Sequence, residues 1–494
     1  MNKKREKAKP VDIESKFFVD ELFFSSTDFI GNILTGNSVF VRVSQYEKEE
    51  IIGAPHNIIR HPDMPKIVFK VLWDYIKAKR TVVAYVKNLT KEGRYYWVLA
   101  TVFPMSDGYV SIRIKPTSKF FALIPDVYQK LLEVEKSKDV PSEGMDASLA
   151  QLLKILKSKG FNDYDSFMTA VLMEELSSRQ HNIKTSKELS DFSQEISENE
   201  TISAEHKSLQ SVFDTFKEVK GFCHSINSSF NNLFKSFELL LSIEDILSKN
   251  STEVLTFSED ISTHSLNADI ESYRVGVKGR TLSVIAKSIK VKSEEISSFT
   301  HTVVDIAREV VSRTQELEFQ TATPRLQSDM IDFFVKELLI NTIQGKIENS
   351  EIDEAQENIV LLVNLFVNTF SHLNETLLPL KSKIDETIHL INSINKYIKE
   401  LERTYVVGNI EASRIGDQGK KFVIIFDQIN ESTETTKQRL QGFYQYLVNV
   451  LGAIDAINQS NAKILKYVNS IKTLIHQLNR TKGNRSQVND LVEV

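Results

Sequence analysis

A proline-rich run near the amino terminus holds the side chains best suited to bind a charged small molecule. Residues 51–70 read IIGAPHNIIRHPDMPKIVFK, with Arg60, His61 and Asp63 at their centre. The planar guanidinium of Arg60 can donate parallel hydrogen bonds to a phosphate, while His61 and Asp63 can hold polar edges of a ligand. Neighbouring prolines stiffen the loop and reduce the ordering that binding requires. These side chains suit a nucleotide-type ligand, although a salt-bridged structural loop would use the same residues.

Two later segments repeat one charged pair and two glycines. Residues 267–289 read NADIESYRVGVKGRTLSVIAKSI and residues 409–429 read NIEASRIGDQGKKFVIIFDQI, with an offset of 140 residues between Glu271 and Glu411. Glycine permits the positive φ of a tight reversal, so each G-x-x-G pair predicts a turn between helices. Matching positions are Ile270 and Ile410, Glu271 and Glu411, Arg274 and Arg414, Gly276 and Gly416, and Gly279 and Gly419. A single Glu–Arg pair would be a surface ion pair worth roughly a few tenths of a kcal/mol, but the repetition predicts tandem antiparallel hairpins.

Strand-like and turn-like segments surround the first candidate site. β-Branched and aromatic residues dominate 39–43, 81–87, 95–102 and 109–114, and the run KEGR at 91–94 has the composition of a hairpin turn. Residues 65–78 have the pattern of a helix between strands. These segments predict an α+β domain of about one hundred residues.

The later part of the chain carries a seven-residue apolar repeat. Alternating steps of three and four residues from Leu209 reach Leu240 through apolar positions only. The same steps from Leu440 to Leu478 meet one polar residue, Asn461. A repeat of this length needs helices that supercoil with a partner, and a buried Asn commonly sets their register. Cys223, on the first seam, is interpreted as an inert core residue.

The prolines separate these two regions. Eight of the ten prolines and both tryptophans lie before residue 142, and only Pro324 and Pro379 follow residue 200. Because proline breaks helices, long helices fit the later region. Between the regions, residues 142–158 and 164–178 are amphipathic and predict a helical connector. The predicted organisation is a basic tail (1–19), the α+β domain (20–118), the connector (119–200), a first hairpin (201–323), a second hairpin (324–480) and a flexible tail (481–494).

Composition and missing motifs narrow the class of protein. With 61 basic and 66 acidic side chains among 494 residues, the net charge of −5 gives no field that would attract nucleic acid. No apolar run reaches the roughly 18 residues that span a bilayer, and no apolar core follows the basic start, so we expect a cytoplasmic protein. The single cysteine leaves no disulfide and no cysteine-rich metal site. The P-loop, GxSxG and HExxH motifs are absent, so we expect no enzyme.

Both repeated segments resemble the hairpin tip of methyl-accepting chemotaxis proteins. The residues that carry the resemblance are Asn267, Glu271, Arg274, Gly276 and Gly279 in the first copy, and Glu411, Arg414, Gly416, Gln418 and Gly419 in the second. The resemblance implies that the tips bind a chemotaxis histidine kinase and its coupling protein, together with other receptors in an array. Departures from the pattern stand at Thr263, His264 and Val277 in the first copy, and at residues 407–408 in the second.

In that family two hairpins from two subunits form a four-helix bundle. Two hairpins in one chain therefore suggest that long antiparallel coiled coils form the four-helix bundle within a monomeric pseudo-dimer. The alternative is that each hairpin dimerises with its copy in another chain. The predicted fold class is an α+β domain followed by a mainly α region.

The first candidate site resembles the PAS domain of aerotaxis transducers, whose pattern runs G-x-P-H-N-x-x-R-H-P-D-M-P, then V-K-N and Y-W-V. Those receptors bind FAD without a covalent bond and report redox state, so the resemblance implies that Arg60, His61 and Asp63 contact FAD. The family has a flavin-associated tryptophan six residues before the asparagine of V-K-N, where this chain has Val82. The alternatives to FAD are a cavity that is empty or takes another ligand, and haem.

Together the resemblances imply a cytoplasmic energy- or aerotaxis-like transducer. The PAS domain would sense redox state or a small ligand, the connector would pass the change to the helices, and the tips would modulate the kinase. The alternative is a non-catalytic adaptor or scaffold of chemoreceptor arrays with a cofactor-free PAS domain. A bound flavin would favour the transducer.

Overall fold

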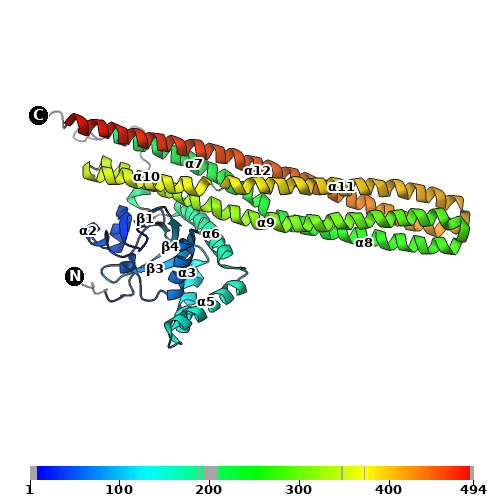
Figure 1. The fold of residues 1–494 in the computed structure, drawn as a ribbon, viewed down its shortest axis with the longest axis horizontal. Helices are drawn as coiled ribbons and strands as arrows, with labels where there is room; N and C mark the ends of the chain where they lie inside the picture. The colour runs from blue at the N-terminus through cyan, green and yellow to red at the C-terminus, as the bar shows by residue number, and fades with distance from the viewer. Residues whose placement is uncertain (1–7, 187, 194–209, 347–348, 372, 490–494) are drawn as a thin grey trace. The chain divides into compact units, whose positions relative to one another are not determined.

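The computed structural model describes residues 8–186, 188–193, 210–346, 349–371 and 373–489 (Figure 1). Parts of several predictions lie outside these ranges: the ends of both tails, the end of the connector, and Leu209 on the first heptad seam. The described chain forms two compact units. Unit 1 is built from Met1–Asn231, Glu318–Leu373 and Asn461–Val494, and unit 2 from Asn232–Leu317 and Asn374–Ser460.

An antiparallel sheet of five strands forms the α+β domain in unit 1. The strands are β1 (Leu22–Thr27), β2 (Ile33–Gly36), β3 (Val82–Leu89), β4 (Tyr95–Pro104) and β5 (Tyr109–Ile114), in the order β2-β1-β5-β4-β3. The strands predicted over 81–87, 95–102 and 109–114 are confirmed as β3, β4 and β5. The predicted hairpin turn is also confirmed, and Gly93 adopts a φ of +88° there. A Cβ at Gly93 would lie 2.2 Å from the carbonyl oxygen of Lys9, so this turn requires glycine.

The strand predicted over residues 39–43 is wrong, because these residues form helix α1 (Ser38–Ser44). Val39, Phe40 and Val43 are buried, and this spacing lies on one face of a helix rather than one face of a strand. Burial in the core therefore outweighed the β propensity of the valines. Helix α2 (Lys48–Ile51) and the 3-10 helix η1 (His56–Ile59) follow, and α3 (Lys66–Lys77) confirms the helix predicted over 65–78.

The connector is helical, as predicted. After the 3-10 helix η2 (Phe121–Leu123) it contains α4 (Ile124–Lys136), α5 (Pro141–Ser158), α6 (Tyr164–Thr185) and the 3-10 helix η3 (Asp191–Ser193). The buried carboxylate of Glu175 on α6 accepts hydrogen bonds of 2.8 Å from the hydroxyls of Tyr85 and Ser118. These bonds fix α6 against strand β3.

Long helices make up the rest of the described chain, and the predicted fold class is thereby confirmed. They are α7 (Gln210–Leu241), α8 (Ile243–Val275), α9 (Arg280–Ile343), α10 (Asn349–Ser371), α11 (Leu373–Arg414) and α12 (Lys420–Asn489). The heptad positions from Phe216 to Leu240 and from Leu440 to Ile475 are buried, including Cys223 and Asn461. Burial raises the pKa of the Cys223 thiol well above its usual value, in agreement with an inert core residue.

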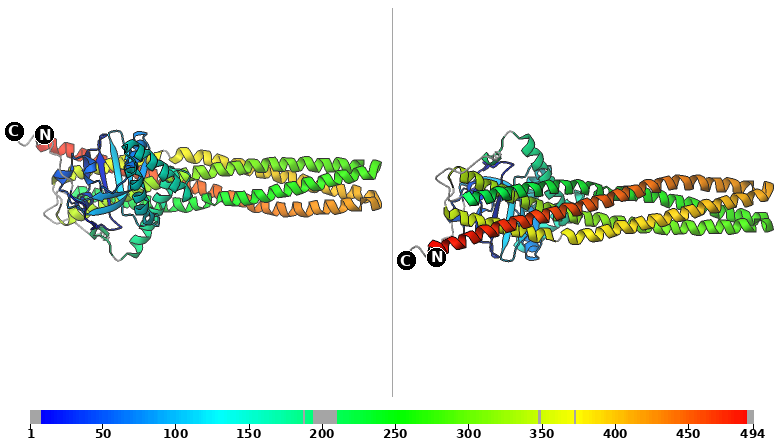
Figure 2. Two further views of the ribbon diagram at one scale, coloured as in Figure 1. Left: turned by 90° about the horizontal axis from the view of Figure 1, so that it is seen from below. Right: turned by 90° about the horizontal axis from the view of Figure 1, so that it is seen from above.

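In unit 2, parts of four helices each contact two neighbours. The joining pairs are Ser258 with Ser293 (2.9 Å, α8 to α9), Lys292 with Glu400 (3.0 Å, α9 to α11), Lys437 with Glu402 (2.8 Å, α12 to α11) and Lys421 with Glu271 (2.9 Å, α12 to α8). The turn between α8 and α9 lies at the same end as the turn between α11 and α12 in both views of Figure 2. Helix α9 passes through Pro324, where the second hairpin is predicted to begin, without a break. The domain boundaries stay predictions.

Candidate functional site

A cavity of about 250 Å³ lies between the sheet and the segment formed by η1 and α3. Strands β1, β3, β4 and β5 supply one wall, and residues 55–60 with α3 supply the other. The polar lining includes Ser25, His56, Arg60, Asn88, Ser111 and Arg113. The aromatic lining consists of Phe69, Trp73 and Tyr109. Such an apolar cavity with a few convergent polar groups is the usual form of a small-molecule site.

Arg113 places a buried positive charge on the wall of this cavity. Its side chain is 3% exposed, and its Nη2 donates to Nε2 of His56 at 2.7 Å and to Oγ of Ser25 at 3.0 Å. Burial lowers the pKa of Arg113 to about 10, so the guanidinium remains charged at neutral pH. Among the described residues no carboxylate forms an ion pair with it. A buried cation without a counter-charge favours a ligand with acceptor or anionic groups.

His56 is held neutral beside this charge. Burial and the charge of Arg113 lower the pKa of His56 to about 3. Because a guanidinium can only donate, Nε2 of His56 must accept, and the proton of the neutral ring is then assigned to Nδ1. The ring stacks on Phe40, with the ring centres 6.4 Å apart and an interplanar angle of 11°. His56 therefore orients the guanidinium of Arg113 and, because the ring is neutral, does not repel it.

Acid is expected to destabilise this domain through His56. Between pH 6.5 and about 3 the unfolded chain binds a proton that the folded His56 does not, so stability falls as the pH drops through this window. The loss from pH 7 to pH 5 should reach up to about 2 kcal/mol. Urea unfolding followed by tryptophan fluorescence measures it, because Trp73 and Trp97 both lie in this domain. The variant His56→Gln keeps an acceptor and should lose less stability over the same range; an equal loss would contradict the assignment.

Three buried polar atoms of residues that line the cavity have no hydrogen-bond partner in the structure. They are Nη1 of Arg113, Oγ of Ser111 and Nδ2 of Asn88. Leaving such groups unpaired costs roughly 1–3 kcal/mol each, so a native site that keeps them normally pairs them with a ligand or water. Since an arginine and an amide nitrogen only donate, the matching ligand presents acceptor atoms on this side.

The structure brings one of the three predicted residues to the cavity. Arg60 lines it, with its guanidinium 3.9 Å from the ring centre of Phe69, and burial lowers the pKa of Arg60. His61 and Asp63 are not part of the lining. The Nδ1 atom of His61 accepts from the backbone N–H of Asp63 at 3.1 Å, and the Asp63 carboxylate pairs with Lys87 at 2.7 Å. His61 and Asp63 thus belong to a salt-bridged loop beside the cavity.

Two residues of the cavity, Trp73 and Arg113, were not predicted, because the prediction considered only adjacent positions of one loop. Val82 is buried and does not line the cavity, whereas Trp73 of α3 supplies an aromatic surface there. Arg113 could have been found from strand periodicity, because Tyr109, Ser111 and Arg113 alternate with the apolar residues of β5. A charged residue on the same face of the strand as Tyr109 and Ser111 was the available signal.

The second group of predicted residues forms two matching turns in unit 2. Helix α8 ends at Val275, the 3-10 helix η5 (Gly276–Gly279) follows, and the 3-10 helix η6 (Gly416–Gly419) joins α11 to α12 in the same way. Gly276 and Gly416 adopt positive φ angles of 73° and 64°. A Cβ at Gly279 or Gly419 would lie 2.2 Å or 1.8 Å from a backbone carbonyl oxygen of the preceding helix. The first glycine of each pair makes the turn and the second permits close packing.

The two tips share an ion pair, a pattern of burial and three exposed apolar positions. The ion pairs Glu271–Arg274 and Glu411–Arg414 are formed, Asn267 and Gln418 are exposed, and residues 271–280 have the same sequence of buried and exposed positions as residues 411–420. Three apolar side chains on each tip are between 45% and 69% exposed: Leu266, Ile270 and Val284 on the first, and Val406, Ile410 and Ile424 on the second. These positions correspond at the offset of 140 residues. Paired apolar patches of this kind are typical of protein-binding surfaces.

Comparison with known proteins decides what the first domain is. A model of the PAS fold matches residues 33–113. Residues 33–113 are a PAS domain. The chain is 38% identical over 126 residues to the aerotaxis receptor of Escherichia coli (strain K12), covering 24% of this chain and 25% of the receptor. It is 26% identical over 116 residues to the biofilm dispersion protein BdlA of Pseudomonas aeruginosa, covering 23% of this chain and 27% of that protein. The chain thus matches about a quarter of each relative's length.

Strand β1 connects the cavity of the PAS domain to helix α9. Successive side chains of a strand point to opposite faces, and Ser25 of β1 bonds Arg113 at the cavity while the ring of Phe24 packs edge-on against Phe334 of α9 at 5.4 Å. The buried carboxylate of Glu337, one turn further along α9, accepts from Nδ2 of Asn37 at 2.9 Å.

Asn37 holds this junction together. Its amide nitrogen also donates to the carbonyl of Leu22 at 3.1 Å, and its Oδ1 accepts from the backbone N–H of Phe24 at 3.3 Å. The carboxylate of Glu337 further accepts from the backbone N–H of Ser38 at 3.1 Å, the first residue of α1. Burial raises the pKa of Glu337. The carboxylate of Glu337 on α9 therefore accepts hydrogen bonds from Asn37, which is itself bonded to β1, and from the start of α1.

Two kinds of feature are absent from the described residues. None of their helices contains a stretch sufficiently long and hydrophobic to cross a bilayer. Within the same ranges, no group of three or more His, Cys, Asp or Glu side chains is arranged to hold a metal ion.

Proposed function

We propose that this chain is a cytoplasmic chemotaxis-type signal transducer whose PAS domain senses redox state through FAD. The observation that carries the proposal is the cavity of about 250 Å³ in the PAS domain, which is lined by Arg113, Ser111 and Asn88, each with a buried polar atom that has no partner. The likeness of this domain to the aerotaxis receptor, at 38% identity, supports the same reading. His61 and Asp63 act in the proposal by shaping the loop that positions Arg60.

The lining residues fit the ring system of a flavin. That ring is flat and aromatic and is edged with carbonyl and nitrogen acceptors, which match the surface of Trp73 and the donors of Arg113 and Asn88. Arg60, part-exposed at the cavity, is the residue suited to a phosphate of FAD. When bound, the flavin would supply reversible uptake of electrons and protons. The fixed charge of Arg113 stabilises the more negative state of any ligand beside it.

A change in the charge of a ligand beside Arg113 reaches the helices through β1. Ser25 and Phe24 are adjacent on that strand, so a displacement of Ser25 toward or away from Arg113 also moves the Phe24–Phe334 contact. The connector provides a second route, because Glu175 of α6 bonds to Tyr85 on β3. Both routes end on helical elements, and α9 continues without a break to the turn at Gly279.

The junction at Glu337 is expected to weaken strongly in the variant Glu337→Ala. The change leaves the amide of Asn37 and the N–H of Ser38 without their acceptor, at roughly 1–3 kcal/mol for each buried donor. Hydrogen exchange of the amides of α1 should therefore accelerate by about tenfold or more. Glu357→Ala removes an exposed carboxylate from α10 and serves as the control. Equal exchange in the two variants would show that Glu337 does not hold the junction.

We propose that the tips bind a chemotaxis histidine kinase and its coupling protein, with other receptors in an array. The repeated apolar patches and Glu–Arg pairs support this reading. The ring of contacts among α8, α9, α11 and α12 supports a four-helix bundle made within one chain, a monomeric pseudo-dimer. Light scattering of the purified chain should then give the mass of one 56.4 kDa polypeptide at micromolar concentration. A tight dimer whose dissociation unfolds the helices would contradict it.

The decisive experiment is an absorbance spectrum of the full chain, oxidised in air and then reduced with dithionite. Flavin bands that bleach on reduction, in a 1:1 ratio with protein, would support the redox transducer. A haem spectrum would replace FAD with haem. Protein made with ample flavin that absorbs only near the aromatic band would favour the alternative, an adaptor of receptor arrays with a cofactor-free PAS domain. The departure at Val82 is the sequence feature that favours this second function.

A further inference from the structure

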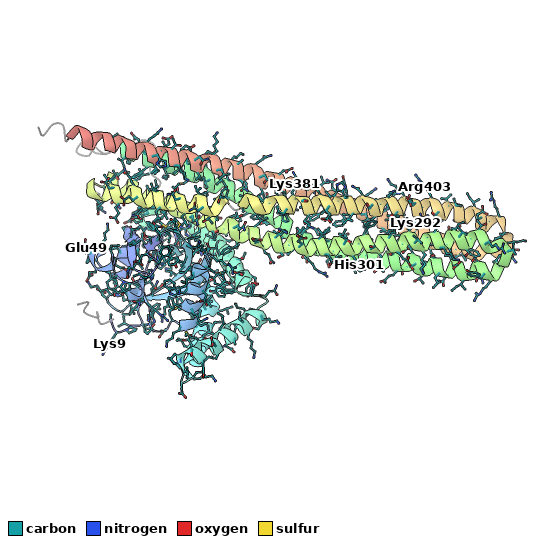
Figure 3. The ribbon with its side chains drawn as sticks, in the orientation of Figure 1. Lys9, Glu49, Lys292, His301, Lys381 and Arg403 are labelled. Carbon is teal, nitrogen blue, oxygen red and sulfur yellow. The ribbon has the colours of Figure 1, made fainter. Side chains whose placement is uncertain are left out.

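A groove between α11 and α12 in unit 2 carries an excess of positive charge. It encloses about 390 Å³, and its charged lining consists of Lys396, Lys399, Arg403 and Lys437 with a single carboxylate, Glu400. Asparagine and glutamine amides complete the lining. Figure 3 labels Arg403 on α11 and Lys292 on the neighbouring α9. The groove lies within unit 2, and its residues are distant in the sequence from those that line the PAS cavity.

The chain neutralises the cations of the groove only in part. The carboxylate of Glu400 is engaged by Lys292 at 3.0 Å, and that hydrogen bond holds the pKa of Glu400 below its usual value. Lys437 pairs with Glu402 at 2.8 Å. In the part of the chain that the structure describes, Lys396, Lys399 and Arg403 form no ion pair. Other lysines on α11 differ in this respect, since Lys381 and Lys383 pair with carboxylates of neighbouring helices (2.7 and 3.2 Å).

The internal repeat shows that the hairpin does not need these cations. At the offset of 140 residues, the first hairpin has Thr256, Glu259, Thr263 and Ser297 in place of Lys396, Lys399, Arg403 and Lys437. The corresponding helices α8 and α9 pack without them. Like charges three and four residues apart on a helix repel one another and cost stability. The second hairpin keeps this cluster despite its cost, whereas the first hairpin folds without it. The cluster therefore favours a role in ligand binding over a role in folding.

We propose that this groove binds a small anion with two or more linked phosphate groups, the chemistry shared by inorganic polyphosphates and nucleoside polyphosphates. Arg403 can bind one phosphate through two parallel hydrogen bonds, and the lysines act as point charges. Lys396 and Arg403 are about 10 Å apart along the helix axis, which exceeds the reach of a single phosphate. The enclosed volume lies in the range of small-molecule sites, about 300–1,000 Å³. This inference does not depend on the proposed function.

Titration calorimetry of the full chain with inorganic triphosphate tests the site. The expected result is saturable binding of one anion per chain. The double variant Lys396→Glu with Lys399→Glu should weaken it by at least about tenfold. The control is Lys463→Glu with Lys466→Glu, which makes the same change in net charge at exposed positions with the same spacing on α12, outside the groove. The control should bind within about twofold of the parent chain.

Three outcomes would overturn the proposal. The first is the absence of saturable binding at low ionic strength, and the second is an equal loss in both double variants, which would reflect net charge alone. The third is tighter binding of a glutamate-rich peptide than of triphosphate, which would make the groove a docking surface for an acidic protein. Circular dichroism of each variant shows whether its helices are intact. If Lys396→Glu with Lys399→Glu unfolds the chain, Lys399→Gln provides the same test with a smaller change.

Discussion

Replacement of Gly419 by alanine is expected to destabilise the second hairpin by roughly 2–4 kcal/mol. The new Cβ would lie 1.8 Å from the carbonyl oxygen of Ala412 and 2.6 Å from its carbonyl carbon. Both atoms belong to the backbone of α11, so no side chain can move aside and the helices must separate. Thermal unfolding followed by circular dichroism, together with hydrogen exchange across residues 405–430, measures the effect. Gly279→Ala should behave alike in the first hairpin, where the distance is 2.2 Å.

The matched control for this prediction is Gly442→Ala. Gly442 is exposed inside α12 and a Cβ there meets no atom within 4 Å. Alanine should stabilise the helix by up to about 1 kcal/mol, because glycine is the poorer helix former. Opposite signs for the two substitutions would establish that the turn, and not helix propensity, requires Gly419. Equal behaviour would contradict the packing seen at the tip.

Replacement of Arg113 by leucine is expected to lower ligand affinity and to leave the PAS domain as stable as before, or more so. The guanidinium is buried without a carboxylate among the described residues, and replacing such a charge by an apolar side chain is often neutral or stabilising by up to roughly 4 kcal/mol. Ser25 lies 3.5 Å from Nε2 of His56 and can take over as its donor. Loss of a hydrogen bond to a charged group should weaken flavin binding between about tenfold and 100-fold.

Two measurements on one sample separate these effects. Flavin content after dialysis reports affinity, and urea unfolding of the flavin-free protein, followed by tryptophan fluorescence, reports stability. Arg94→Leu, which removes a half-exposed cation at the β3–β4 turn, is the control and should change neither strongly. If Arg113→Leu lowers stability and leaves flavin content unchanged, Arg113 is a structural residue and the assignment of the cavity is wrong.

The fold was predictable where a local pattern had one reading. The heptad seams of α7 and α12 and the two glycine-paired turns follow from periodicity and from glycine's access to positive φ. The error at α1 arose because residues 39–43 satisfy both a strand and a helix by composition. Only contacts from distant segments, such as Glu337 at the start of α1, distinguish the two. β2 and the hydrogen bonds of Asn37, which follows it, depend on the same kind of long-range contact and left no local signal.

The candidate site was predictable in part for a related reason. Arg60 was found because its neighbours in sequence form a recognisable loop. Trp73 of α3 and Arg113 of β5 follow Arg60 by 13 and 53 residues, and only the folded domain brings them together. His61 and Asp63 share the loop with Arg60, but the loop turns over residues 61–64 and Asp63 pairs with Lys87. Adjacency in sequence did not imply adjacency at the site.

The contact between Lys421 and Glu271 has no counterpart on the other side of the repeat. The position equivalent to Lys421 is Thr281, and Glu411 pairs with Arg414 of its own hairpin. In a homodimer each mutation appears twice, so a change that suits one half is also imposed on the other. A gene that encodes both hairpins removes this constraint. Selection can act on each tip separately, as it does on the two products of a duplicated gene, and can assign them different partners.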